Sequence, residues 1–209
     1  MNVSLNEVEA TAKRAARGAG YSWGLAEEAA KATRWLCAQG QNGTRALAQL
    51  LQLELTRAPA QHTPPNLSSE WQSDDQLCPL ATGALLSDCA LRLNSSPIEI
   101  RNVAVPELLL PFAANAARLL KTCVSLEYDQ AVAETDGYDL SLTALIPNHA
   151  HQVLVRLGGQ VNTPAPHRTR ADPDPSDWDI LNQFAHRTYA PATEESRLLG
   201  AGAGLSDND

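Results

Sequence analysis

Capping and stop signals divide the beginning of this chain into three short amphipathic helices. Ser4 and Glu7 form an S-x-x-E pattern, in which each side chain can satisfy the backbone N–H of the other residue at a helix start. Ser22 is placed to cap a second helix, which Gly40 is expected to end because glycine adopts the left-handed conformation at little cost. Thr44 is the predicted N-cap of a third helix. Apolar residues recur at helical spacing between these signals, which predicts a three-helix unit.

The middle of the chain shows strand signals. Ile98 and Ile100 alternate with polar residues, and a helix is predicted to start at Pro106. Further alternating segments follow, and Asp136-Gly137 separates two of them, which is the pattern of a two-residue β-hairpin. We expect a strand, a helix and then an antiparallel meander of three to four strands.

These signals predict an α+β fold in one domain that spans residues 1–209. A chain of this length can bury a core without disulfides or metals. The expected parts are a helical unit over about 1–56, an irregular surface excursion over 57–77, an α+β body over 78–161, and a linker, C-terminal helix and flexible Gly-Ala tail over 162–209.

Charge and composition exclude several classes of function. The formal net charge is −8, and the densest basic cluster is Lys13, Arg14 and Arg17 on one predicted helix. Nucleic acids and anionic membranes attract larger clusters of Lys and Arg, so neither is an expected partner. No apolar run approaches the roughly 20 residues of a membrane-spanning helix, and the first residues lack the pattern of a secretory signal. The sequence predicts a soluble cytoplasmic protein whose four widely spaced cysteines are free thiols.

The most distinctive candidate site lies at the predicted start of the second helix. Tyr21 and Trp23 stand between glycines there, and Trp23, Glu27 and Arg34 share one helix face. A tryptophan, a carboxylate and a guanidinium on one face suit a small polar molecule, and glycines leave room for it. The alternative is structural, with the two aromatic residues packing between helices and Glu27 favouring the positive helix end.

The same stretch carries a family resemblance. The run from Ser4 to Trp35, SLNEVEATAKRAARGAGYSWGLAEEAAKATRW, resembles an uncharacterised bacterial (proteobacterial) family of unknown function. The closing RTY and GAGAGLSDND segments are similar to the end of that family, so the resemblance covers nearly the whole chain. It implies a single bacterial metabolic domain. The family has no assigned activity, so the resemblance implies no catalytic or binding residue.

Metal and cofactor sites are not expected. His149 and His151 lie two residues apart on a predicted strand and should share a face, together with Val153 and Val155. Two ligands alone make a weak metal site, and the sequence does not identify a third among candidates such as Glu127, Asp139 and His186. No dinucleotide or phosphate-loop motif is present.

Two functions from different classes are compatible with these observations. One is a small-molecule enzyme or ligand-binding domain with a pocket around Tyr21, Trp23, Glu27 and Arg34. Tyr189, Glu194 and Arg197 are candidates to complete that pocket from the C-terminal segment. The other is a non-catalytic accessory or oligomer-forming subunit that uses the same aromatic segment and the tail for protein contacts. No nucleophile and base can be paired by spacing, so the sequence predicts no reaction type.

Overall fold

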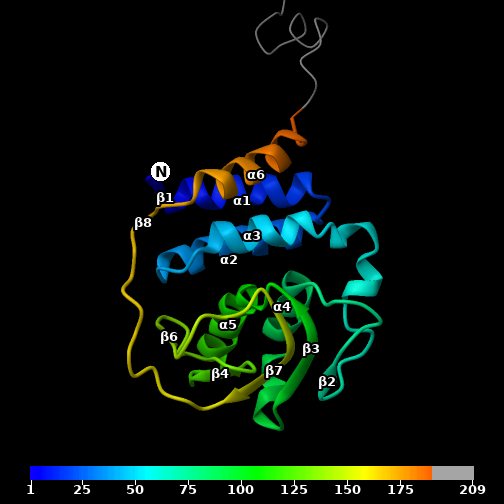
Figure 1. Ribbon diagram of the computed structural model, residues 1–209. Coiled ribbons are helices and arrows are strands. Elements are labelled where there is room, and N and C mark those ends of the chain that lie inside the picture. Colours follow the sequence, from blue (N-terminus) through cyan, green and yellow to red (C-terminus); the bar gives the residue numbers. More distant parts are fainter. Residues whose placement is uncertain (190–209) are drawn as a thin grey trace, which may run out of the picture.

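The chain forms stacked layers of helices above a mixed β-sheet (Figure 1). The computed structural model describes residues 1–189. Helices α1 and α6 pack side by side, α2 and α3 lie below them, and α4 and α5 lie between α2 and the sheet. The helices are α1 (Leu5–Gly18), α2 (Trp23–Ala38), α3 (Gly43–Gln52), α4 (Pro79–Asp88), α5 (Leu110–Leu120) and α6 (Pro175–His186), with short 3-10 helices at Leu55–Arg57, Pro59–His62, Ala90–Asn94 and Pro106–Leu109.

The main sheet confirms the α+β class and contains a Greek-key arrangement. Its strand order is β2-β3-β7-β4-β5-β6, with β2 parallel to β3 and the other neighbours antiparallel. Strands β4, β5 and β6 form the expected meander, but β7 returns to the free side of β4 and joins it to β3. Val155 of β7 therefore lies opposite both Ile98 and Leu126. The strands are β2 (Glu70–Trp71), β3 (Ile98–Ala104), β4 (Val124–Glu127), β5 (Val132–Thr135), β6 (Leu140–Leu142) and β7 (His149–Leu157), and β1 (Val3–Ser4) pairs separately with β8 (Arg170–Ala171).

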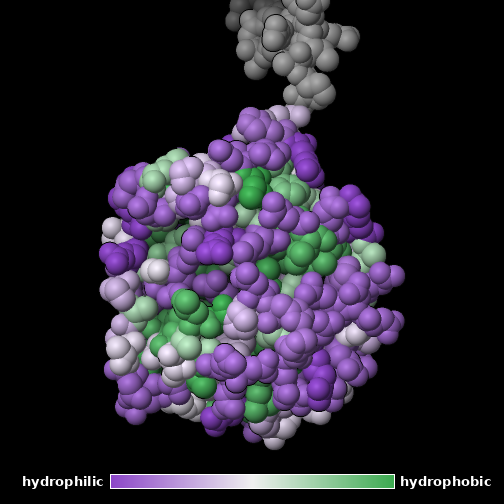
Figure 2. All heavy atoms as spheres, viewed as in Figure 1, coloured by the Kyte–Doolittle hydropathy of each residue, from purple (hydrophilic) through white to green (hydrophobic). Residues whose placement is uncertain are grey.

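Buried apolar side chains form one continuous cluster that runs from Val3 to Ala185. Residues 57–77 contribute to it and are more than a surface excursion, because Trp71 on β2 is fully buried and its indole N–H donates to the Ser68 carbonyl. The outer surface in Figure 2 is mainly hydrophilic, and its apolar residues gather in separate patches. Within residues 1–189, no helix combines the length and apolarity needed to cross a membrane.

Side-chain caps start the first three helices. The Ser4 hydroxyl accepts a hydrogen bond from the Glu7 N–H (3.1 Å), and the Ser22 hydroxyl accepts one from the Leu25 N–H (3.4 Å), as predicted. The prediction of Thr44 as the third N-cap is wrong. Asn42 is the cap, and its Oδ1 accepts from the Arg45 N–H at 3.2 Å. Asparagine and threonine are both good caps, and the chain enters the helix two residues earlier than expected.

The Asp136-Gly137 pair lies at a hairpin tip between β5 and β6, as predicted. The connection has four residues rather than two, because Thr135 pairs with Leu140. Asp136 Oδ1 accepts hydrogen bonds from the N–H groups of Tyr138 and Asp139, each at 2.8 Å. These backbone N–H groups hold the pKa of the Asp136 carboxyl below its usual value. Gly137 occupies the left-handed region with φ 100°, which suits glycine.

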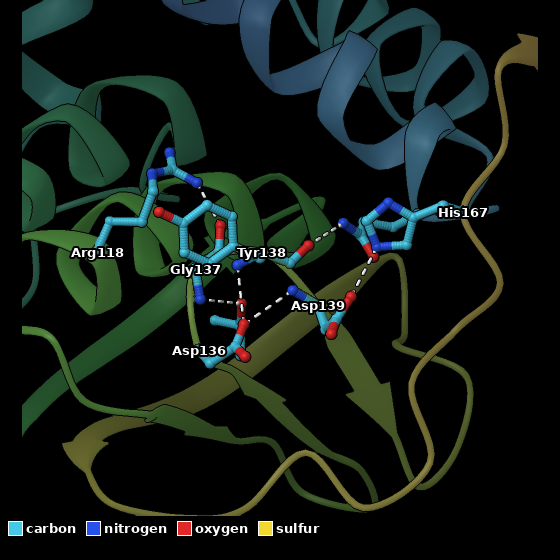
Figure 3. A network of polar contacts seen from close by, with 8 residues as sticks. Arg118, Asp136, Gly137, Tyr138, Asp139 and His167 are labelled. Atoms are coloured by element: carbon cyan, nitrogen blue, oxygen red, sulfur yellow. Dashed lines mark hydrogen bonds and ion pairs between the residues drawn. The ribbon is translucent and has the colours of Figure 1, made fainter.

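Polar contacts from three directions hold this hairpin tip in place (Figure 3). Gln39, at the end of α2, donates its Nε2–H to the Tyr138 carbonyl at 2.7 Å. Arg118 of α5 donates to the Gly137 carbonyl. His167 Nε2 lies 2.7 Å from an Asp139 carboxylate oxygen. Residues 158–169, between β7 and β8, thereby run from the sheet to the helical layers, and we call them the wrapping segment.

Candidate functional site

A cleft of about 520 Å³ opens where the end of α1, the start of α2 and the end of α6 meet. Its position follows from the fold, because α1 packs against both α2 and α6. We call it the arginine cleft, and it is lined by Lys13, Arg14, Arg17, Trp23, Arg187, Thr188 and Tyr189. The cluster of Lys13, Arg14 and Arg17 that the sequence shows on one helix is thus joined by a fourth cation from a segment about 170 residues later.

Two exposed aromatic rings of the arginine cleft are held by arginines. Trp23 is 66% exposed, and the Arg17 guanidinium carbon lies 4.4 Å from its ring centroid. Arg17 Nη1 also donates a hydrogen bond to the Tyr21 carbonyl, which fixes the guanidinium over the indole. Tyr189 is 53% exposed, and its hydroxyl accepts a hydrogen bond from Arg14 Nη1 at 2.7 Å. Its ring also meets the edge of His186 at a centroid distance of 5.3 Å.

The cleft carries an excess of positive charge. Lys13 is neutralised by Glu27, whose carboxylate lies 2.7 Å from Nζ. That hydrogen bond and the lysine charge hold the pKa of Glu27 below its usual value. Within residues 1–189, Arg14, Arg17 and Arg187 have no carboxylate within 4 Å. Among the described residues, three guanidinium groups thus line one cleft without an acidic partner, although the net charge of the chain is −8.

Glu27 and Arg34 lie further along the same side of α2, where they bind α1 rather than each other. Arg34 Nη1 lies 2.6 Å from a Glu9 carboxylate oxygen and 2.9 Å from the Asn6 side-chain oxygen. Glu27 and Glu9 line a second, shallow cleft of about 450 Å³, and Lys13 lines both clefts. Trp23, Glu27 and Arg34 therefore lie on one side of α2, as their spacing predicted, and that side is directed toward α1. Of these three residues, only Trp23 lines the arginine cleft.

Tyr21 is directed away from these clefts. Its side chain is 5% exposed, and its hydroxyl lies 3.5 Å from Cys78 Sγ in the core. Burial raises the pKa of this phenol well above its usual value, and the neighbouring cysteine adds to the effect. The Tyr21 side chain thus packs in the core at the connection between α1 and α2, while its backbone carbonyl accepts the hydrogen bond from Arg17. The candidate residues Glu194 and Arg197 and the Gly-Ala tail lie outside the described residues.

His149 and His151 come together at one end of β7, with ring centroids 4.8 Å apart. The expectation that they share a face with Val153 and Val155 is wrong, because Ala150, Val153 and Val155 are the buried positions. The alternation of buried and exposed residues along β7 shifts by one position opposite Asn102 of β3, and Asn102 adopts a left-handed conformation with φ 54°. The Asn102 side-chain oxygen lies 2.7 Å from His149 Nε2. In the described part of the chain, no three His, Cys, Asp or Glu residues are grouped to hold a metal ion.

Another polar cleft, of about 490 Å³, lies between the start of α3 and the wrapping segment. Cys37 lines it, and the nearby backbone of Thr44 and Gly43 favours the thiolate form of the sulfur. Burial nevertheless raises the pKa of the Cys37 thiol, so it is a thiol near neutral pH rather than a nucleophilic thiolate. Arg168 and Arg170 form the other wall.

Sequence reasoning did not identify Arg187, Arg168 or Arg170 as site residues. No known motif marks them, and each becomes part of a cleft only through packing of distant segments. The Lys13, Arg14 and Arg17 cluster was visible in the sequence but was used only to argue against nucleic-acid and membrane partners; its helical spacing is the signal that could have pointed to one end of the arginine cleft.

Residues 3–78 match a family described as protein of unknown function (DUF3726). The match covers α1, α2, α3 and the segment up to the start of α4, and so includes Lys13, Arg14, Arg17 and Trp23. Comparison with curated proteins and with solved structures found no match.

Proposed function

We propose that this protein is a ligand-binding domain that holds a small anionic molecule in the arginine cleft. The observation that carries the proposal is the convergence of Arg14, Arg17 and Arg187 without a carboxylate partner among the described residues. The three positive charges repel one another, and an anion bound between them would be attracted by all three. Guanidinium groups bind carboxylates and phosphates through paired, charge-assisted hydrogen bonds. The volume of the cleft lies within the usual range for small-molecule sites.

Binding is a better-supported function than catalysis at this site. Within residues 1–189, the side chains that line the cleft include no cysteine, histidine or carboxylate that could act as a nucleophile or a base. The Thr188 hydroxyl donates a hydrogen bond to the Ala185 carbonyl at 2.7 Å and so caps the C-terminal end of α6. A long polyanion such as nucleic acid is disfavoured because the net charge of −8 repels it outside the cleft.

A protein-contact role is the second candidate, and the composition of the cleft supports it. Trp, Tyr and Arg are the residue types that contribute most at protein interfaces. Trp23, Tyr189 and Arg187 are all exposed around this cleft. In this alternative the protein is an accessory or oligomer-forming subunit, and a second copy or an acidic partner covers the cleft. We further propose a bacterial protein that acts in the cytoplasm, a location supported by the four free cysteines.

Thermal unfolding with small anions separates these candidates. Phosphate, sulfate and citrate are added at constant ionic strength, with chloride as the reference. At 100 times its dissociation constant, a bound anion adds about 2.7 kcal/mol to stability. Arg187→Gln should abolish this stabilisation, whereas Arg92→Gln, at an exposed position on the 3-10 helix Ala90–Asn94, should retain it. Equal responses of wild type and Arg187→Gln would reject the anion site. A concentration-dependent dimer that Arg187→Gln dissociates would favour the protein-contact role.

A further inference from the structure

Trp23 differs from every other tryptophan of the chain in its exposure. Trp71 and Trp178 are buried, and Trp35 is half-buried. Trp23 keeps 66% of its surface accessible although it belongs to a well-packed helix. Arg17 covers one ring face, and Lys13 lies farther off at 5.9 Å from the centroid. A large indole surface therefore remains open to whatever enters the arginine cleft.

The indole is also fixed in position before any ligand arrives. Trp23 is the first residue of α2, directly after the N-cap Ser22. The stacked Arg17 is anchored in turn on the Tyr21 carbonyl. A ring held between a helix start and an anchored guanidinium loses little freedom on binding, which favours affinity. The second aromatic residue, Tyr189, is held differently, by a hydrogen bond from Arg14 to its hydroxyl.

Space and positive charge adjoin this ring. Gly24 follows Trp23, and a Cβ added to Gly24 would meet no atom within 4 Å. Arg187 lines the cleft with its guanidinium carbon 4.3 Å from the Phe184 ring centroid, and it has no carboxylate partner within residues 1–189. The first turn of α2 contains no acidic residue, so the positive end of its dipole is not neutralised there.

We infer that the ligand of the arginine cleft is a planar aromatic ring that carries an anionic group, which stacks on Trp23 while Arg187 and Arg17 bind the anion. This inference rests on the proposed function and adds the class of ligand. An aliphatic anion would use the arginines but would leave the indole in water. Stacking of a planar ring on an aromatic side chain and hydrogen bonds to a charged group both add to affinity. Nucleoside monophosphates and aromatic carboxylates share this chemistry.

Isothermal titration calorimetry on the full chain tests the inference with matched probes. Adenosine monophosphate carries both ring and anion, ribose 5-phosphate carries the anion alone, and adenosine carries the ring alone. 2-Naphthoate tests a carboxylate in place of the phosphate. We expect adenosine monophosphate or 2-naphthoate to bind at least tenfold more tightly than either single-feature probe. Whichever of the two binds identifies the anionic group.

Variants separate this inference from the proposed function on which it rests. Trp23→Leu should reduce binding of the ring-bearing anion to the level of ribose 5-phosphate, and Trp23→Phe should restore most of it. Ribose 5-phosphate that binds as tightly as the ring-bearing anions, or wild-type affinity in Trp23→Leu, would overturn the aromatic class and leave the anion site in place. Absence of binding by every anionic probe would overturn both. Circular dichroism confirms that each variant is folded.

Discussion

Glu107 provides the sharpest test of how this fold tolerates charge. It lies on the 3-10 helix Pro106–Leu109, directly after Val105 and Pro106, and its carboxyl is largely buried. Burial raises the pKa of Glu107 from 4.5 to about 7, and the more distant Arg45 offsets only part of this effect. Cys37 and Tyr128 are the other titratable groups beside it, and its charge helps to raise the pKa of each.

The sign of the effect on stability follows from proton linkage. Below pH 4.5, Glu107 is protonated in both the folded and the unfolded chain and has no pH-dependent effect on stability. Between pH 4.5 and about 7 the unfolded chain loses its proton first, so the free energy of unfolding falls as the pH rises. Each pKa unit corresponds to about 1.36 kcal/mol, so the total loss is about 3 kcal/mol above pH 7.

Glu107→Gln removes this penalty while it keeps the size of the side chain. We expect the variant to exceed wild type in free energy of unfolding by about 3 kcal/mol at pH 8, and to match it within about 1 kcal/mol at pH 4.5. Urea unfolding at both pH values, followed by circular dichroism, measures the difference. Glu127→Gln, which removes a surface carboxylate paired with Arg156, should change stability by less than about 1 kcal/mol at both pH values. A difference in free energy of unfolding between Glu107→Gln and wild type that did not grow from pH 4.5 to pH 8 would refute the reasoning.

Substitutions at three glycines give further predictions. Gly83→Ala should destabilise by about 1–3 kcal/mol in urea unfolding, because the new Cβ would lie 2.6 Å from Cγ of the buried Phe112. Gly24→Ala is the matched control and should be neutral or stabilising by up to about 1 kcal/mol, so a loss there equal to that of Gly83→Ala would contradict the packing explanation. Gly18→Ala should weaken phosphate binding in calorimetry as well as stability, because its Cβ would lie 2.7 Å from the Phe184 carbonyl carbon and push α6 away from α1. Unchanged phosphate affinity in a folded Gly18→Ala protein would show that α6 does not shape the cleft.

Local signals in the sequence predicted local structure well. Ser4 and Ser22 cap the helices that follow them, because a cap depends only on a few neighbouring residues. The third cap was placed at Thr44 instead of Asn42, at a helix start that also makes a close tertiary contact. Gly43 forms the first turn of α3 in close contact with α2, where a Cβ would lie 2.5 Å from the Thr33 carbonyl oxygen. The identity of that neighbour cannot be read from the residues around position 43.

Long-range pairing was the part that sequence patterns could not predict. The alternating segments were identified, but nothing local indicates that β7 inserts between β3 and β4 instead of extending the meander. The alternation of β7 also changes face opposite Asn102, a residue on another strand. The histidine pair could be placed on one face from its spacing alone, whereas its relation to Val153 depends on that distortion.

The arginine cleft shows how the residues of a candidate site can be only partly visible in a sequence. Lys13, Arg14, Arg17 and Trp23 lie within 11 consecutive residues, inside the segment that matches the family of unknown function. Arg187 and Tyr189 come from beyond α6, outside the matched segment, and reach the cleft because α6 packs closely on α1 at Gly18. The matched segment alone would therefore present a tryptophan and a short basic stretch on an open helix surface. Docking of α6 converts that surface into a cleft with cations on two sides, so the geometry on which the proposed anion site depends needs segments from both ends of the described chain.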